Sequence, residues 1–182
     1  MVVIDATMLL LLLRPETSVP ASIDRPKERI EYLVQRLDQA KTKIIIPTPT
    51  LSEALVRAGA TGAQRIVEQL QRFSVFSIEA FDTRAAIEVA AMSRDALEKG
   101  NKRGQSTASW AKVKYDRQIV AIAKVNGATT IYSDDGDIKT LGRRSSINVV
   151  TLAELPLPPQ PAQLDLELRH IGDEIAKDEA AP

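Results

Sequence analysis

The sequence contains no cysteine and a single histidine, His170. The lack of cysteine excludes disulfide bonds, thiolate catalysis and zinc–thiolate sites together. One histidine cannot form a multi-histidine metal site, and its position argues against a Ser-His-Asp catalytic triad. A catalytic or metal-binding site in this chain would therefore depend on carboxylates and hydroxyls.

The chain also lacks net charge, because 24 lysines and arginines balance 24 aspartates and glutamates. No whole-molecule field then draws it to nucleic acid or acidic lipid, so a polyanion would have to be held by a local basic patch or through bound metal. Long hydrophobic runs are absent as well. The apolar stretch 8–13 is six residues, too short for a signal peptide core or a membrane span. We expect a cytoplasmic protein that does not associate with membranes.

With 182 residues, 44% hydrophobic and 26% charged, the chain is long enough for one soluble domain with a buried core. Short β-branched runs alternate with amphipathic stretches, which predicts βαβ units. The expected fold is α/β, a three-layer α/β/α sandwich with a mostly parallel sheet of four to five strands. Strands are expected at 2–5, 43–46, 73–78, 128–132 and 147–150. Helices are expected at 7–13, 26–41, 51–58, 63–72, 82–99 and 110–125.

We place the core domain at residues 1–152 and a separate tail at residues 153–182. Four prolines between positions 156 and 161 predict a stiff, extended connector at the start of this tail. An amphipathic helix is expected at 163–179. An isolated helix of this length is marginal in water, so it should pack on the core or on a partner subunit, as in a homodimer. Its apolar side consists of Leu164, Leu168, Ile171 and Ile175.

Acidic residues stand at or soon after the ends of several predicted strands. Asp5 ends the first strand, Glu53 follows the second, Asp116 lies near the start of the apolar helix that precedes the fourth, and the segment 133–137 (Ser-Asp-Asp-Gly-Asp) follows the fourth. The carboxyl ends of parallel strands share one edge of a sheet, so these carboxylates would meet in one pocket. Their mutual repulsion is costly unless a divalent cation is bound. The pattern indicates a site for Mg²⁺ or Mn²⁺, which prefer hard carboxylate oxygens.

Two of these positions have plainer structural explanations. An ionised Asp5 at the end of a buried strand is disfavoured unless it is paired or bound to metal. It could instead cap the following helix, with Thr7 sharing that role. Glu53 could form an ion pair with Arg57, four residues later on a solvated helix face.

The other two positions also have structural alternatives. Asp116 precedes Ile119 and Val120 by three and four residues, which places it on the buried side of its helix and favours a site. The alternative is a charge at a helix N-terminus, stabilised by the helix dipole. The carboxylates of 133–137 could simply cap a short helical turn that ends near Leu141.

The ordered set of motifs resembles the PIN domain family. The resemblance rests on residues 2–7 (Val-Val-Ile-Asp-Ala-Thr), on Glu53, on 116–123 (Asp-Arg-Gln-Ile-Val-Ala-Ile-Ala) and on 133–137. It covers residues 1–152. It implies Mg²⁺- or Mn²⁺-dependent hydrolysis of phosphodiester bonds, most often in RNA, with 5′-phosphate and 3′-hydroxyl products.

The resemblance also implies roles for particular residues. Many bacterial members of the family resemble the VapC-type toxin ribonucleases of type II toxin–antitoxin pairs, which implies an antitoxin protein as a partner. Ala6 stands where the family often has Ser or Thr, so one supporting hydroxyl is missing. The metal-site and catalytic carboxylates would be Asp5, Glu53, Asp116 and Asp135, with Asp137 as a further metal ligand and with Thr7 and Ser133 as supporting hydroxyls.

RNA contact is expected from the basic segment 99–117. It carries six lysines and arginines against one aspartate, and Trp110 and Tyr115 within it could stack on unpaired bases. The alternative is an ordinary solvated face with Trp110 in the core. The candidate RNA-binding residues are Lys102, Arg103, Lys114 and Arg117.

Two other classes of function remain open. The chain could be a catalytically silent PIN-like module that binds RNA or a protein partner. It could also be a phospho-acceptor α/β domain that uses Asp5, although position 7 is Thr where haloacid dehalogenase-type phosphatases have a second aspartate. A P-loop is excluded, because no Gly-Lys-Ser/Thr follows a glycine-rich turn.

Overall fold

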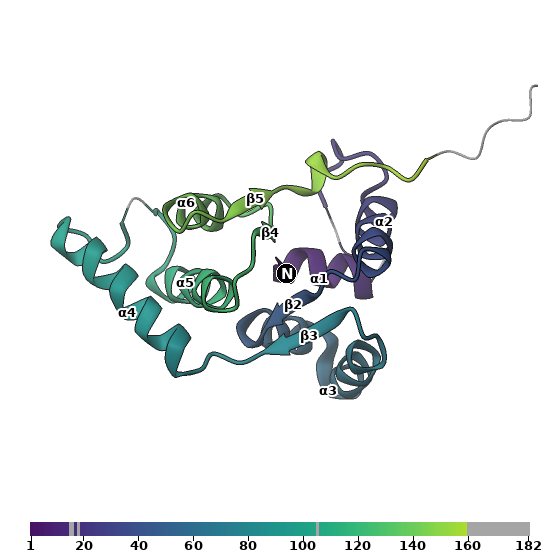
Figure 1. The fold of residues 1–182 in the computed structure, drawn as a ribbon, viewed down its shortest axis with the longest axis horizontal. Coiled ribbons are helices and arrows are strands. Elements are labelled where there is room, and N and C mark those ends of the chain that lie inside the picture. Colours follow the sequence, from purple (N-terminus) through teal and green to yellow (C-terminus); the bar gives the residue numbers. More distant parts are fainter. Residues whose placement is uncertain (15–16, 18, 105, 160–182) are drawn as a thin grey trace, which may run out of the picture.

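A computed structural model describes residues 1–14, 17, 19–104 and 106–159, and the helix expected at 163–179 lies outside them. Within the described residues, five short strands form one sheet in the order β3-β2-β1-β4-β5 (Figure 1). Every neighbouring pair of strands is parallel, which confirms the predicted sheet. The strands are β1 (Val2–Ile4), β2 (Ile44–Pro47), β3 (Phe76–Glu79), β4 (Thr130–Tyr132) and β5 (Asn148–Val150).

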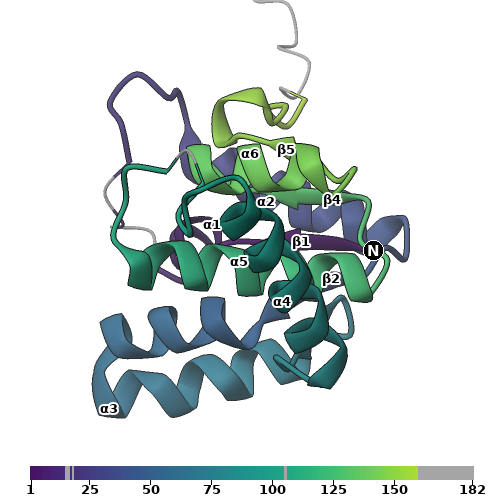
Figure 2. The same cartoon turned by 90° about the vertical axis from the view of Figure 1, so that its left-hand side faces the viewer.

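Helices cover both faces of this sheet, as predicted for a three-layer sandwich (Figures 1 and 2). The first three helices pack on one face and the next three on the other. On the first face lie α1 (Ala6–Leu13), α2 (Pro26–Gln39) and α3 (Thr48–Arg72). On the second face lie α4 (Thr83–Glu98), α5 (Trp110–Val125) and α6 (Gly136–Arg144), and a short 3-10 turn, Leu152–Glu154, follows β5.

Successive side chains of the central strands enter opposite cores. Val2 and Ile4 of β1 pack with α1, α2 and α3, whereas Val3 between them packs with α4, α5 and α6. Ile45 of β2 joins the same core as Val3. Because the strand repeat is two residues and both faces are covered, the fully buried strands β1 and β2 must be apolar throughout. This explains why the sequences of these two strands are β-branched runs.

The main differences from the predicted elements concern α3, β3 and α6. The two helices expected around Gly59 form one kinked helix, α3, in which Gly59 has φ 70° and ψ 174°. Glycine adopts this positive φ without a Cβ clash, so the chain bends there. β3 begins three residues later than predicted, since the Phe76 N–H bonds back to the Phe73 carbonyl in a turn. The expected short turn near Leu141 is a full helix, α6.

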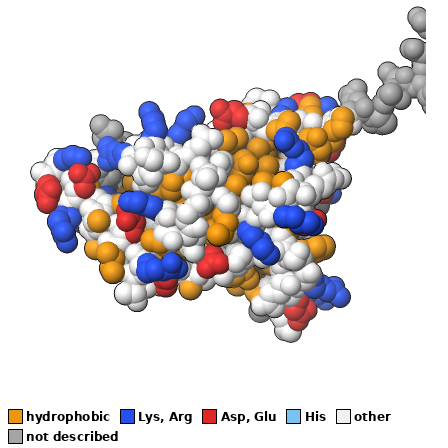
Figure 3. All heavy atoms as spheres, in the orientation of Figure 1, with side chains coloured by type: hydrophobic (Ala, Val, Ile, Leu, Met, Phe, Trp, Pro, Cys, Tyr) orange, Lys and Arg blue, Asp and Glu red, His pale blue; other side chains and the backbone are white. Residues whose placement is uncertain are grey.

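The surface is mixed in charge. Positive and negative side chains are interspersed over the face shown in Figure 3, in keeping with the zero net charge. Among the described residues, no helix combines the length and the apolar character needed to cross a membrane.

Candidate active site

An open cleft of about 700 Å³ lies at the carboxyl edge of the sheet. β1 and β4 are neighbours there, but β1 leads into α1 on one face and β4 into α6 on the other. Ligand crevices of open α/β sheets form where the chain direction diverges in this way. Asp5 and Asp135 reach the cleft just after these two strands, Asp116 from α5 and Glu53 from α3. Four carboxylates that are distant in sequence therefore line one cleft.

Asp5 is held by neutral hydrogen-bond donors. It is the N-cap of α1, where one carboxylate oxygen accepts a 2.9 Å hydrogen bond from the Met8 N–H. The other oxygen accepts from the hydroxyl of Ser133. Only 5% of Asp5 is exposed, and this burial raises its pKa to about 6 against the effect of both hydrogen bonds. Asp5 therefore caps α1, as the structural alternative proposed, and the same hydrogen bond holds its carboxylate at the cleft.

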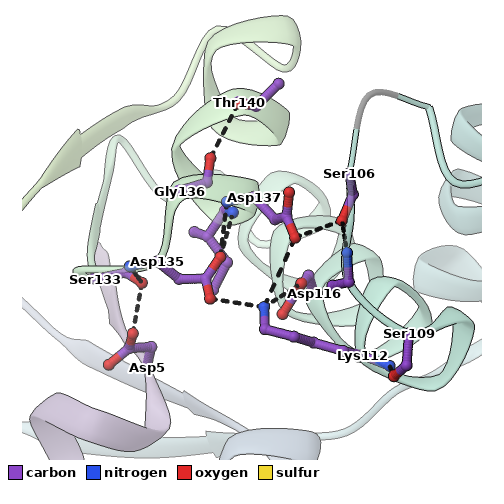
Figure 4. Close-up of polar contacts among 12 residues, drawn as sticks. Asp5, Ser106, Ser109, Lys112, Asp116, Ser133, Asp135, Gly136, Asp137 and Thr140 are labelled. Carbon is purple, nitrogen blue, oxygen red and sulfur yellow. Dashed lines mark hydrogen bonds and ion pairs between the residues drawn. The ribbon is translucent and has the colours of Figure 1, made fainter.

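Asp116, Asp135 and Asp137 form a tight cluster beside Asp5, with carboxylate oxygens within 4.8 Å of one another. The ammonium group of Lys112 lies among them (Figure 4). Its Nζ is 2.8 Å from Oδ2 of Asp116, 2.6 Å from Oδ2 of Asp135 and 3.9 Å from Oδ2 of Asp137. One positive charge is therefore shared by three carboxylates.

Asp116 lies in the second turn of α5, which begins at Trp110. The helix dipole acts within the first turn, so the dipole alternative does not explain this residue. Asp116 is 5% exposed, and burial raises its pKa to about 6 although Lys112 acts in the opposite direction. A buried carboxylate with a raised pKa in a cleft is typical of functional sites.

Asp135 combines a structural contact with a cleft-facing one. Its Oδ1 caps α6 by accepting from the N–H groups of Asp137 and Ile138, at 2.7 and 3.1 Å. Its Oδ2 points to Lys112. Partial burial acts to raise its pKa, but the hydrogen bonds from Lys112 and from the α6 backbone outweigh burial and hold the pKa below its usual value. Ser133 links this residue to Asp5, because its Oγ accepts from the Asp135 N–H at 3.1 Å.

Glu53 and Thr7 lie at the exposed side of the cleft. Oε1 of Glu53 is 2.9 Å from the guanidinium of Arg57, the i,i+4 pair that the spacing suggested. Glu53 lines the cleft but does not belong to the tight cluster found among the described residues. Thr7 also lines the cleft, with an exposed side chain.

Lys112 is a cleft residue that the sequence analysis did not select. It was counted only as one of the charges of the basic segment 99–117. Its i,i+4 spacing from Asp116 was the signal that could have identified it, since such pairs face each other on a helix. Burial acts to lower its pKa, but hydrogen bonds to Asp116 and Asp135 outweigh burial and raise the pKa to about 12. Lys112 is therefore a cation throughout the physiological pH range.

The candidate RNA-binding residues are divided by the fold. Lys102, Arg103 and Lys114 are exposed. Arg117 is only 3% exposed, and this burial contradicts the expectation that it contacts RNA. Its guanidinium donates to the Lys102 carbonyl at 2.7 Å and to the hydroxyl of Ser93 at 3.0 Å. An enclosed guanidinium with these partners ties α4, α5 and the connecting loop together.

Trp110 lies among the cations of the same segment. Its half-buried ring has Lys102 Nζ at 5.3 Å, Lys114 Nζ at 6.0 Å and the Arg117 guanidinium at 5.4 Å from the ring centroid. These distances are those of cation–π contacts, so three cations of the chain itself already contact the Trp110 ring. Tyr115 is 49% exposed and lines the cleft, so it is the more accessible aromatic side chain of the segment.

The tight cluster has the chemistry of a divalent-cation site. Asp116, Asp135 and Asp137 offer three hard oxygen ligands, as Mg²⁺ and Mn²⁺ require. The Lys112 ammonium shows that one positively charged centre can approach the Oδ2 atoms of all three residues. These residues therefore fit a bound metal ion.

The protein is an open parallel α/β/α sandwich with a cleft of carboxylates at the topological switch point of its sheet. The family model described as PIN domain matches residues 15–144. The chain belongs to the PIN domain family.

Two solved structures share the fold. VapBC2 from Rickettsia felis, bound to a DNA fragment from their promoter, aligns with a TM-score of 0.55 and 13% identity, over 82% of this chain and 97% of that one. DNA-bound VapBC from Salmonella typhimurium aligns with a TM-score of 0.53 and 17% identity, over 83% and 97%. A search of curated protein sequences gives no significant match.

Proposed function

We propose that this protein is a metal-dependent ribonuclease that hydrolyses phosphodiester bonds. The observation that carries the proposal is the convergence of Asp5, Asp116 and Asp135 on one open cleft from three separate elements. Membership of the PIN domain family supports the same class of activity. The cleft is open rather than enclosed, which suits a polymeric substrate that must pass through it.

Asp116, Asp135 and Asp137 would hold Mg²⁺ or Mn²⁺, and Asp5 would complete the acidic set. When bound, the cation supplies charge stabilisation at the scissile phosphate and a lowered pKa for the attacking water. The chain itself orients the carboxylates. Asp135 is fixed by the α6 cap and Asp5 by the α1 cap and Ser133. Glu53, at the exposed side of the cleft, would position the water or add a metal ligand.

The walls of the cleft favour unpaired RNA. Tyr115 is 49% exposed there, and the exposed Val56 and the buried Ile119 line the same cleft. An aromatic ring at this position can stack on a base only when that base is not already stacked in a duplex. Lys102 and Lys114, exposed in the neighbouring segment, would contact backbone phosphates.

We propose a protein antitoxin as the partner of this chain. Support comes from two of the solved structures that share its fold, which are VapBC assemblies bound to DNA. The antitoxin role would be supported by a gene for a small DNA-binding protein next to the gene for this chain and by co-purification of the two products. A homodimer formed through residues 163–179 stays a prediction.

The activity can be tested with the purified full chain and end-labelled RNA that contains single-stranded loops. We expect cleavage with Mn²⁺ or Mg²⁺ and none with EDTA, and products with 5′-phosphate ends that can be ligated. A 2′,3′-cyclic phosphate end, or cleavage that survives chelation, would contradict the proposal. RNA binding without cleavage under every metal condition would favour the silent module instead.

A further inference from the structure

We propose that Lys112 is an internal counter-cation of the acidic cluster and that a divalent cation binds to the cluster by displacing its ammonium group. The inference rests on the proposed function, because it takes Asp116, Asp135 and Asp137 as the metal-binding residues. It concerns a residue of this chain that neither the family match nor the structural comparisons assign a role.

The geometry places the ammonium group where a metal ion would be coordinated. Nζ of Lys112 lies 2.8 Å from Oδ2 of Asp116 and 2.6 Å from Oδ2 of Asp135, with Oδ2 of Asp137 at 3.9 Å. A cation bound to this cluster would take a carboxylate oxygen from each of the same three residues, and Oδ2 is the atom of each that approaches Lys112. Two positive centres in contact with the same oxygens would repel each other strongly at this range. Binding of the metal and the present position of Lys112 therefore exclude each other.

Lys112 is also the member of the group that can move. Its side chain is 43% exposed, whereas that of Asp116 is 7% exposed. The ammonium sits at the end of a flexible four-carbon stem. Figure 4 shows this stem extending from the N-terminal end of α5, near Ser109, to the three carboxylates. The Lys112 N–H is held by the Ser109 hydroxyl at 3.2 Å, so the backbone can stay in place while the stem swings out.

The carboxylates, in contrast, are held in position without the lysine. Asp135 is fixed by two backbone N–H groups of α6. Asp137 accepts a 2.7 Å hydrogen bond from the hydroxyl of Ser106. Asp116 lies on the buried side of α5. Release of Lys112 would thus leave a formed ligand set, and the lysine would lower the apparent metal affinity by competing for it.

The test is isothermal titration of the full chain with Mn²⁺. Lys112→Met removes the competing charge and keeps an unbranched stem, and we expect it to bind Mn²⁺ roughly tenfold more tightly than wild type. Lys124→Met is the matched control, because Lys124 lies on the same helix and pairs with a single carboxylate, Glu88, outside the cluster. This control should change the Mn²⁺ affinity by less than about twofold, since its charge is farther from the ligands.

A second readout needs no activity. Without metal, Lys112→Met should melt at a lower temperature than wild type, because the three clustered carboxylates lose their only close cation among the described residues. Mn²⁺ should then raise the melting temperature of this variant more than that of wild type. Lys112→Arg keeps the charge and should bind Mn²⁺ no more tightly than wild type. If Lys112→Met does not fold, Lys112→Gln takes its place in both measurements.

The outcomes separate the two proposals. If wild type and Lys112→Met bind Mn²⁺ with equal affinity, or the variant binds more weakly, the role of Lys112 is overturned and the proposed metal site stands. If wild type does not bind Mn²⁺ but Lys112→Met does, the competition is supported. If no variant binds Mn²⁺, the proposed metal site fails, and the role of Lys112 is overturned with it.

Discussion

Asp5 and Asp116 face the same cleft and are equally buried, each 5% exposed, but they are stabilised by different kinds of partner. Asp5 accepts hydrogen bonds from a backbone N–H and a hydroxyl, both neutral. Asp116 accepts from the ammonium group of Lys112. The pKa of both carboxyls is nevertheless raised to about 6, and burial is the main cause in each case.

Asp135 shows what burial changes. It contacts the same ammonium as Asp116, but its side chain is 27% exposed against 7%, and its pKa lies below the usual value. The cation together with two backbone N–H donors therefore outweighs the partial burial of Asp135, whereas the same cation alone does not outweigh the nearly complete burial of Asp116. The two deeply buried carboxylates are the ones whose ionised forms destabilise the metal-free fold. They are also the ones that a bound cation would stabilise most.

The largest expected effect concerns Asp116, a member of the acidic cluster. Asp116→Asn should reduce RNA cleavage by about a thousandfold, because a metal ion contributes several kcal/mol of transition-state stabilisation. The metal-free variant should be as stable as wild type or more so, since it no longer buries a charge at neutral pH. Cleavage rates and urea denaturation would measure the two effects.

Asp38→Asn is the control for this experiment, because it removes an exposed aspartate from α2, on the opposite face of the sheet. It should leave both properties unchanged. Normal cleavage by Asp116→Asn together with a loss of stability would mean that Asp116 only anchors Lys112.

The second prediction uses the half of the cleft that contains Asp5. Its folded-state pKa of about 6 lies above the ordinary value of 3.8, so its contribution to stability is present at acidic pH and is lost as the pH rises through 6. Asp5→Asn does not titrate. Between pH 4 and pH 7.5, wild type should therefore lose about 2.4 kcal/mol of unfolding free energy relative to this variant.

Urea denaturation of both metal-free proteins across that pH range measures this difference. A difference that stays constant would show that Asp5 ionises normally in the fold. The conclusion that burial raises the pKa of Asp5 despite its neutral hydrogen-bond donors would then be wrong.

The third prediction tests whether Mn²⁺ binds at the acidic cluster of the cleft. Mn²⁺ at about ten times its dissociation constant should stabilise wild type by roughly 1.4 kcal/mol. For a chain of this length, this is a rise of roughly 3–6 °C in melting temperature. Asp135→Asn should lose most of the rise, whereas Ser133→Ala should keep most of it, because Ser133 contacts Asp5 and the backbone N–H of Asp135 but not the Asp135 carboxylate. Equal shifts in wild type and Asp135→Asn would place the Mn²⁺ ion elsewhere.

The smallest expected effect lies outside the cleft, among exposed cations for which the described part of the chain provides no ion pair. Neutralising Lys102, Arg103 and Lys114 together should weaken RNA binding and reduce its salt dependence, since fewer counterions are released. Filter binding over a series of salt concentrations, in an inactive Asp116→Asn background, measures the slope.

A matched control for this prediction neutralises three exposed basic residues on or just after α2: Lys27, Arg36 and Lys41. This variant has the same change in net charge on a different part of the surface. Equal slopes for the two triple variants would show that the segment 99–117 is an ordinary solvated face.

Much of this architecture follows from the sequence alone. β-branched runs predict four of the strands and an alternating pattern predicts β3, and the alternation of strands with helices predicts a parallel sheet between two helical layers. The strand-end rule placed Asp5 and the segment 133–137 at one edge of the sheet, and the apolar pattern placed Asp116 on the buried side of its helix, whereas Asp135 was singled out within that segment by the resemblance to the PIN domain family. These inferences succeed because they depend on short-range periodicity and on the direction of parallel strands.

Other features were decided by the tertiary structure. Whether the positive charges of 99–117 face RNA, the core or the carboxylates depends on how α5 packs against α4 and α6. That packing buries Arg117 between helices and directs Lys112 toward Asp135, which is distant in sequence. A local pattern specifies which face of a helix is apolar, but it does not specify which side chains from another element lie opposite a charge. The charge balance of the cleft is therefore a property of the packed fold.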